Sequence, residues 1–240
     1  MSRSSLPMKI ESLTSMQLAS MIDHTFLKPF GGPEPIEQLC REAAEFGFAM
    51  VAINPAEVER CVRLLEGTNV GIGAAIGFPL GQSTTTVKKF ETQDAIGRGA
   101  TEIDTVINVR ALQSGDVDTV RREIADMVAV CRPANVICKV ILETCFLTDE
   151  EKRTVCRIAK AEGVDFVKTS TGFGTGGATA EDVRLMFEEV VPDVQVKASG
   201  GVRDLDAALN MIRAGATRIG TSSGVGIVNE FIQREESKDS

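Results

Sequence analysis

Residues 194–222, VQVKASGGVRDLDAALNMIRAGATRIGTS, contain a strand, a helix and a second strand in direct succession. The runs 194–199 and 217–222 are short and mainly apolar, which is typical of strands. Between them Leu205, Ala208, Leu209 and Ile212 recur every three or four residues, so they lie on one face of a helix. Gly215 follows where a helix commonly ends in a left-handed turn. The stretch therefore predicts one repeat of an alternating strand and helix fold.

The same alternation continues through the whole chain. Strands are expected at residues 21–26, 48–53, 70–76, 102–108, 135–143, 165–170, 194–199 and 217–222. Helical patterns separate them, and Thr148 with Glu151 has the spacing of a capping box that begins a helix. Eight strands, each followed by a helix, predict an α/β fold of the (β/α)8 TIM barrel type. A doubly wound open sheet is the main structural alternative.

The 240 residues show no linker rich in serine, glycine or proline, so we expect a single domain. We place the barrel at residues 13–230, between a flexible N-terminus at 1–12 and a flexible tail at 231–240. No apolar stretch approaches the roughly 20 residues that a membrane span needs, and the N-terminus lacks the apolar core of a signal peptide. Membrane attachment is therefore not expected.

The charge and the cysteines narrow the class of protein further. A formal net charge of −8 repels polyanions and argues against a nucleic acid partner, although local lysines and backbone amides can still bind one phosphate group. The six cysteines lie in apolar or helical patterns without the density of a disulfide scaffold, which indicates buried thiols in a reducing compartment. We therefore expect a cytoplasmic protein.

The chain contains a single histidine, His24. A zinc site built on two or three histidines is thereby excluded, and we expect neither a metal nor a cofactor. Strand alternation sends Asp23 and Thr25 to one face and His24 to the other. If the first two face the barrel interior, His24 packs against the helices.

Charged residues interrupt several of the otherwise apolar strands. Burying them costs several kcal/mol unless they are paired or used in chemistry. One interpretation is an ion-pair network that fixes the barrel. The glycine-rich loops that directly follow the strand ends favour a ligand site instead, because active sites of this fold lie at the C-terminal ends of the strands. The residues concerned are Asp23, Asp104, Lys139, Glu143, Lys168 and Lys197.

The three lysines predict covalent chemistry. A buried lysine that faces other cations is pushed toward the neutral amine, which can attack a carbonyl group and form a Schiff base. Lys139, Lys168 and Lys197 on consecutive strands would exert this pressure on one another. The proton transfers of the reaction need a carboxylate, for which Asp104 is the natural choice. These residues alone do not decide whether Lys168 or Lys197 is the nucleophile.

The glycine loops suggest where a phosphate group would bind. Gly200 and Gly201 follow the seventh strand, and GTSSGVG at 220–226 follows the eighth, which are the loops that often hold phosphate in this fold. Gly172, Gly174 and Gly177 match the dinucleotide pattern G-x-G-x-x-G. That pattern normally lies in the first strand-to-helix turn, whereas here it follows five strands, so we set dinucleotide binding aside.

The motifs together resemble those of the deoxyribose-phosphate aldolase family. They are MIDHTFLKP, GFPLGQSTTTVK, EIDTVIN, KVILET, DFVKTSTGF, VKASGGVR and GTSSG, and they extend from residue 21 to residue 224. The resemblance implies a class I aldolase on a TIM barrel. It would reversibly cleave 2-deoxy-D-ribose 5-phosphate to D-glyceraldehyde 3-phosphate and acetaldehyde, without a metal.

The resemblance also implies roles for single residues. Lys168 would form the Schiff base, Lys197 would perturb its pKa and share in proton transfer, and Asp104 would relay protons. Some members of the family use a C-terminal tyrosine in proton transfer, and this chain contains no tyrosine. The expected substrate-binding residues are Asp23, Thr25, Lys139, Thr171, Gly172, Gly200, Gly201, Ser222 and Ser223.

Two other functions remain open from the sequence. The chain could be a different Schiff-base phosphosugar aldolase or a transaldolase, or a barrel that binds a sugar phosphate without catalysis. In each case the partners are small molecules, a phosphorylated sugar and an aldehyde. Barrels of this kind often form homodimers or homotetramers, but no surface pattern in the sequence identifies an interface.

Overall fold

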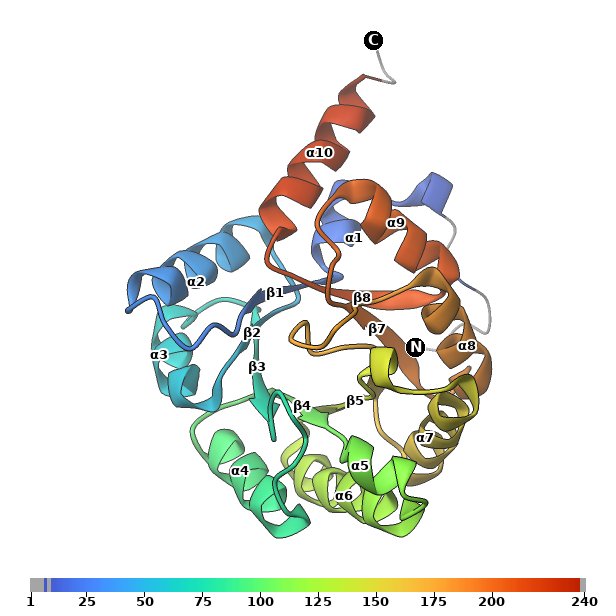
Figure 1. The fold of residues 1–240 in the computed structure, drawn as a ribbon. Coiled ribbons are helices and arrows are strands. Elements are labelled where there is room, and N and C mark those ends of the chain that lie inside the picture. The colour runs from blue at the N-terminus through green and yellow to red at the C-terminus, as the bar shows by residue number, and fades with distance from the viewer. Residues whose placement is uncertain (1–6, 8–9, 238–240) are drawn as a thin grey trace.

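The computed structural model describes residue 7 and residues 10–237, and the described strands close into a parallel barrel (Figure 1). The strand order follows the chain order, and pairing of β8 with β1 completes the ring. This closure confirms the predicted TIM barrel and excludes the open sheet. The strands are β1 Ile22–Phe26, β2 Met50–Ile53, β3 Gly71–Ile76, β4 Glu102–Val106, β5 Ile137–Ile141, β6 Phe166–Lys168, β7 Gln195–Ser199 and β8 Ala216–Thr221.

Helices surround the barrel on its outside (Figure 1). Those described are α1 Ser15–Ala19, α2 Glu34–Phe46, α3 Val58–Leu64, α4 Thr85–Gly97, α5 Val109–Gln113, α6 Val117–Cys131, α7 Asp149–Glu162, α8 Ala180–Val190, α9 Leu205–Ala214 and α10 Gly224–Glu236. Short 3-10 turns lie at η1 Ile10–Ser12, η2 Pro55–Glu57, η3 Arg132–Ala134 and η4 Thr144–Phe146. None of the described helices is long and apolar enough to cross a membrane.

The helix faces follow the predicted spacing. In α9 the four expected apolar residues are buried, and Thr148 forms the predicted capping box with Glu151 at the start of α7. Gly215 ends α9 with φ 116°, and a Cβ atom there would come within 2.5 Å of the Phe187 ring. The position therefore requires glycine both for its backbone conformation and for its close packing.

His24 has the orientation that strand alternation predicts. Its Nε2 lies 2.6 Å from Oε2 of Glu42 on α2, and its ring packs 5.0 Å from that of Phe48. The histidine therefore joins β1 to the helical layer and faces away from the barrel interior. All six cysteines are free, and all except Cys145 are buried.

The predicted elements end somewhat differently from the observed ones. The expected strand at 135–143 stops at Ile141, because Glu143 adopts a left-handed backbone conformation with φ 57° that cannot continue a strand. Residues 10–12 form η1, and α10 continues to Glu236. Residues 1–6, 8–9 and 238–240 of the two predicted flexible ends lie outside the described residues, and the domain limits at 13 and 230 stay predictions.

Candidate active site

The catalytic residues expected from the sequence converge inside the barrel. Asp104 lies in β4, Lys168 is the last residue of β6, and Lys197 lies beside it in β7. Oδ2 of Asp104 accepts hydrogen bonds from Lys168 Nζ at 2.9 Å and from Lys197 Nζ at 2.7 Å. The side chains of all three are at most 4% exposed. Two amines and a carboxylate thus share one water-excluded site.

Six of the charged side chains form a closed ring in which the signs alternate. Lys197 pairs with Asp23 at 2.5 Å and with Asp104, whose second oxygen pairs with Lys139 at 2.9 Å. Lys139 also pairs with Glu102, which is contacted by Arg218 at 3.0 Å. Arg218 Nε then returns to Asp23 at 2.6 Å. We call this set, Asp23, Lys197, Asp104, Lys139, Glu102 and Arg218, the interior ring.

Strand alternation explains why these residues meet. Glu102 and Asp104 are two positions apart in β4, so both side chains point to the same side of the sheet. Residue pairing across neighbouring strands places Asp104 beside Lys139 and Lys197 beside Arg218. The interior of this barrel therefore contains paired charges where many barrels contain only branched apolar side chains.

Apolar groups close the ring from one side. The Phe166 ring lies 5.8 Å from Lys139 Nζ and 5.7 Å from the guanidinium carbon of Arg218, both within cation–π range. Met50 Sδ lies 3.7 Å from Lys139 Nζ. These contacts exclude water, and they raise the cost of any unbalanced charge in the ring.

Lys168 is attached to the interior ring but is not part of it. Its amine contacts Asp104 Oδ2, which Lys197 also uses. Burial lowers the pKa of Lys168 to about 8; Asp104 opposes the shift, while Lys197 and Lys139 add to it. A substantial fraction of this amine is therefore neutral near pH 8.

Lys139 and Asp104 are shifted toward their charged forms instead. Burial alone would lower the pKa of Lys139, but Asp104 and Glu102 outweigh it and raise the pKa above its ordinary value. Burial would likewise raise the pKa of Asp104, but the three lysines hold it well below its usual range. The sequence led us to expect mutual pressure toward neutrality on all three lysines. For Lys139 that expectation is wrong, because two carboxylates contact it.

The mouth of the site lies between the loops that follow β5 and β6. Glu143 accepts hydrogen bonds from the backbone N–H of Thr171 at 3.2 Å and from its hydroxyl. A cavity of about 410 Å³ opens here, lined in part by Val106, Glu143, Thr171 and Phe173. Val106 and Thr171, which line it, lie two and three residues beyond Asp104 and Lys168, so the cavity opens near the ends of β4 and β6.

The glycine loops come together beside this mouth. Gly172 and Gly200 both have positive φ and lie so close that a Cβ on Gly200 would be 3.5 Å from the Gly172 Cα. The Thr221 hydroxyl donates a hydrogen bond to Val202 O at 2.6 Å, which ties the loop after β7 to the loop after β8. Four of the five residues predicted for phosphate contact, Gly172, Gly200, Gly201 and Ser222, therefore lie on linked loops, and Ser223 directly follows.

Ser223 precedes α10, and its side chain forms no capping bond to the described residues of that helix. Its backbone N–H donates to the Thr221 hydroxyl at 2.9 Å. The first amides of α10 thus start at a surface-facing turn, and helix N-termini attract anions.

The remaining predicted contacts lie deeper than expected. Asp23 and Lys139 are fully buried members of the interior ring, with partners on both sides. The half-buried Thr25 donates its hydroxyl hydrogen bond to the Asp23 carbonyl at 2.8 Å. Binding of substrate by these three residues stays a prediction, and the structure gives Asp23 and Lys139 the additional task of holding Lys197 and Asp104.

Sequence reasoning missed Glu102 and Arg218, although a signal for both was present. Glu102 precedes Asp104 by two positions, and Arg218 precedes Gly220 by two, so both lie on the interior-facing side of their strands. Counting every second position in β4 and β8 would have found them.

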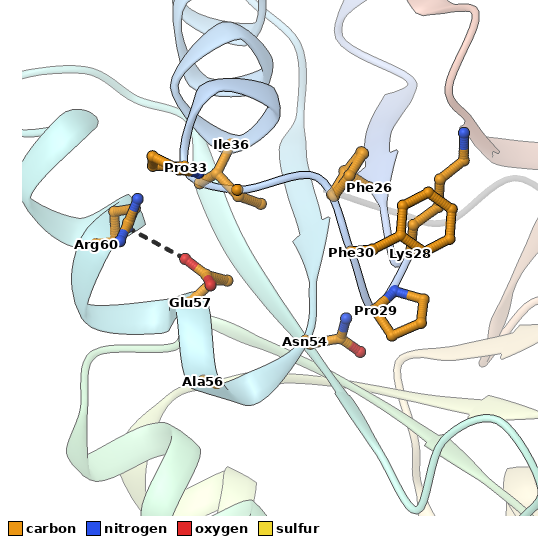
Figure 2. Close-up of a pocket in the computed structure, with 11 residues that line it drawn as sticks. Phe26, Lys28, Pro29, Phe30, Pro33, Ile36, Asn54, Ala56, Glu57 and Arg60 are labelled. Atoms are coloured by element: carbon orange, nitrogen blue, oxygen red, sulfur yellow. Dashed lines mark ion pairs between the residues drawn. The ribbon is translucent and has the colours of Figure 1, made fainter.

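A second cavity, of about 480 Å³, lies away from the amines (Figure 2). Its walls come from the loops after β1 and β2, with Phe26 and Phe30 on one side and the Arg60 to Glu57 ion pair on the other (Figure 2). It contains no member of the interior ring and none of the predicted site residues. This cavity is the larger of the two, but none of the residues for which catalysis is predicted lines it.

Comparisons with known proteins agree with this geometry. A sequence profile described as DeoC/LacD family aldolase matches residues 17–229. A deoxyribose-phosphate aldolase of Bacteroides thetaiotaomicron is 69% identical over 222 residues, covering 92% of this chain and 93% of that protein. Another from Brevibacillus brevis is 55% identical over 214 residues, covering 89% of this chain and 96% of its own.

A solved structure gives the same result. The deoxyribose phosphate aldolase of Aeropyrum pernix, described as having a unique tetrameric structure, superposes with a TM-score of 0.86 at 35% identity. The match covers 92% of this chain and 93% of the other.

Proposed function

The chain belongs to the DeoC/LacD family of aldolases, and we propose that Lys168 is the amine through which it acts. It is a class I aldolase that reversibly cleaves 2-deoxy-D-ribose 5-phosphate to D-glyceraldehyde 3-phosphate and acetaldehyde. One observation supports Lys168 over Lys197: each lysine of the interior ring touches two carboxylates, whereas Lys168 shares a single oxygen. The ammonium with the fewest carboxylate contacts is the least stabilised, so it loses its proton most readily.

The reaction begins with attack of the neutral Lys168 Nζ on C1 of the open-chain sugar. Loss of water from the carbinolamine gives a protonated Schiff base, whose positive charge lies beside Asp104 Oδ2. Removal of the proton from the C3 hydroxyl then breaks the C2–C3 bond, and the electron pair moves into the iminium to form an enamine. D-glyceraldehyde 3-phosphate leaves, C2 of the enamine takes up a proton, and hydrolysis releases acetaldehyde.

Asp104 and Lys197 are proposed to carry the protons of these steps. Asp104 is held ionised by the lysines around it, so it can accept a proton from the carbinolamine and return it. Lys197 donates a hydrogen bond to the same carboxylate oxygen and can resupply it. The pair thereby performs the relay within the chain's own residues, which contain no tyrosine.

The phosphate group is proposed to bind at the linked loops after β6, β7 and β8 and at the start of α10. Positive-φ glycines at 172, 200 and 201 leave the backbone amides open to a close ligand. Ser223→Glu would place a negative charge at this position. It should raise the KM for the phosphorylated sugar by about tenfold or more while leaving that for unphosphorylated 2-deoxyribose nearly unchanged.

Borohydride reduction in the presence of acetaldehyde tests the function directly. We expect mass spectrometry to find the reduced adduct on Lys168, and cleavage of 2-deoxyribose 5-phosphate to be lost in Lys168→Met. Stronger trapping by a longer ketone than by acetaldehyde would favour a different aldolase. A folded protein that binds the sugar phosphate but forms no adduct would indicate a barrel that binds without catalysis.

Schiff-base chemistry makes a further prediction about metals. The iminium performs the electron withdrawal that a metal ion provides in other aldolases, so extensive dialysis against a chelator should leave kcat unchanged. A loss of activity that added zinc restores would contradict the proposed mechanism.

We also propose that the protein is a cytoplasmic homo-oligomer. Its free cysteines suit a reducing compartment, and the description of the Aeropyrum pernix relative as a tetramer supports self-association. Light scattering coupled to size exclusion would give the number of subunits, and a monomer would contradict the proposal.

A further inference from the structure

We propose that Glu102 and Arg218 act as positioning residues, which keep the interior ring neutral so that Lys168 is the one surplus cation and loses its proton. The inference rests on the proposed function, because it concerns the amine that forms the Schiff base. It assigns a role to two residues that lie on the far side of the ring from Lys168.

The geometry of the ring carries this inference. Every member of the ring touches two members of opposite charge, which makes three cations and three carboxylates in a closed circuit. Glu102 and Arg218 close that circuit, since Arg218 bridges Glu102 and Asp23. Without either residue the alternation would be broken, and the ring would carry a net charge.

Burial makes that net charge expensive. The ring side chains are between 0% and 13% exposed, so water screens them poorly. A neutral ring offers Lys168 no net attraction, and an added ammonium would leave the whole buried cluster with one positive charge. The amine outside the circuit is therefore the position from which a proton leaves at lowest cost.

Among the described residues, the charged groups with the largest effect on Lys168 belong to this cluster. Asp104 contacts it directly from β4, and Lys197 lies beside it in β7. Its neighbour in β5 is Ile141, and Lys139 lies two positions earlier on that strand. The remaining ring members complete the set from β1, β4 and β8. Glu143, the next carboxylate toward the mouth, contacts Thr171. Removing the charge of Glu102 and removing the charge of Arg218 should therefore change the proton affinity of Lys168 in opposite directions.

Two substitutions test the sign. Glu102→Gln removes a negative charge, so the midpoint for borohydride trapping with acetaldehyde should move to lower pH by about one unit. Arg218→Gln removes a positive charge and makes the ring attract the Lys168 ammonium, so the midpoint should move to higher pH by about one unit. Arg218→Lys keeps the charge and should leave the midpoint close to that of the wild type.

The double variant Glu102→Gln with Arg218→Gln removes one charge of each sign and should return the midpoint toward the wild-type value. If Arg218→Gln does not fold, Lys139→Met removes another ring cation and should give the same upward shift. If the wild type is trapped and the midpoints of both single variants move in the same direction, or neither moves, the ring inference alone is overturned. Absence of wild-type trapping would instead overturn the proposed function.

Discussion

Among the described residues, two buried lysines have lowered pKa values, yet only one lies where chemistry is expected. Lys88, in α4, pairs with Glu123 of α6 at 2.9 Å and donates a hydrogen bond to the Val106 carbonyl at 2.8 Å. Burial lowers its pKa and raises that of Glu123, and their attraction opposes both shifts. Lys168 is equally buried, with its pKa lowered to about 8.

The difference lies in the partners and in the space around each amine. Lys88 contacts a carboxylate and a carbonyl, and no other described cation pairs with that carboxylate, whose second oxygen accepts from the Asn108 N–H at 3.0 Å. Lys168 shares one carboxylate oxygen with another cation, and it ends a strand that leads directly into a glycine loop lining a cavity. A lowered pKa alone therefore does not distinguish the two lysines; the shared carboxylate and the neighbouring loop do.

Replacing each lysine by methionine gives the largest expected contrast. Lys168→Met removes the proposed nucleophile, so kcat should fall by roughly 10³-fold or more. Lys88→Met removes a structural pair behind the strand ends, and kcat should stay within a few fold of the wild type. Steady-state cleavage assays on both folded variants make the comparison. A loss of activity as large in Lys88→Met would show that the two amines do not differ in role.

The free energy of unfolding should fall more in Lys88→Met than in Lys168→Met. Lys88→Met leaves Glu123 buried without its cation, which should lower the free energy of unfolding by about 3–5 kcal/mol. Replacing both residues, with Lys88→Met and Glu123→Leu, should recover most of that loss. Urea unfolding followed by circular dichroism measures each difference. Equal stability of the single and double variants would mean that the pair contributes little.

The pH dependence of stability should separate the wild type from Lys168→Met. The folded pKa of Lys168, about 8, lies below the value near 10.4 expected in the unfolded chain. Below pH 8 both states bind the proton and the folded protein bears the full cost of a buried ammonium, roughly 3 kcal/mol. The free energy of unfolding should rise between pH 8 and 10, where the unfolded state alone binds the proton. Lys168→Met should lack this rise.

The convergence of the main site residues could be predicted from the sequence, for a physical reason. The carboxyl ends of parallel strands meet at one rim, so charges near the ends of several strands were expected to converge. Asp104, Lys168 and Lys197 do so. Strand alternation likewise predicted that His24 faces the helices, where it meets Glu42.

Three other features could not be predicted, because they depend on contacts and backbone conformations that local sequence patterns do not contain. Contact between Arg218 and Glu102 joins β8 to β4 across the barrel, and the tilt of the strands decides which residues share a layer. Lys88 and Glu123 lie on neighbouring helices, where charged residues are usually exposed, so spacing alone did not indicate a buried pair. The early end of β5 follows from the backbone of Glu143, which no residue preference predicted.

Salt should have the smallest effect, and it tests whether the interior ring behaves as a buried unit. Raising the ionic strength from about 0.1 M to 1 M shortens the screening length from roughly 10 Å to 3 Å, but ions in solution do not enter the ring. The pH midpoint for trapping acetaldehyde, an uncharged substrate, should therefore move by less than about 0.3 units. An exposed lysine shifted by surface charges would return toward its ordinary pKa under the same change. A salt shift as large as those expected for Glu102→Gln and Arg218→Gln would place the controlling charges in solvent, where the ring could not set the proton affinity of Lys168.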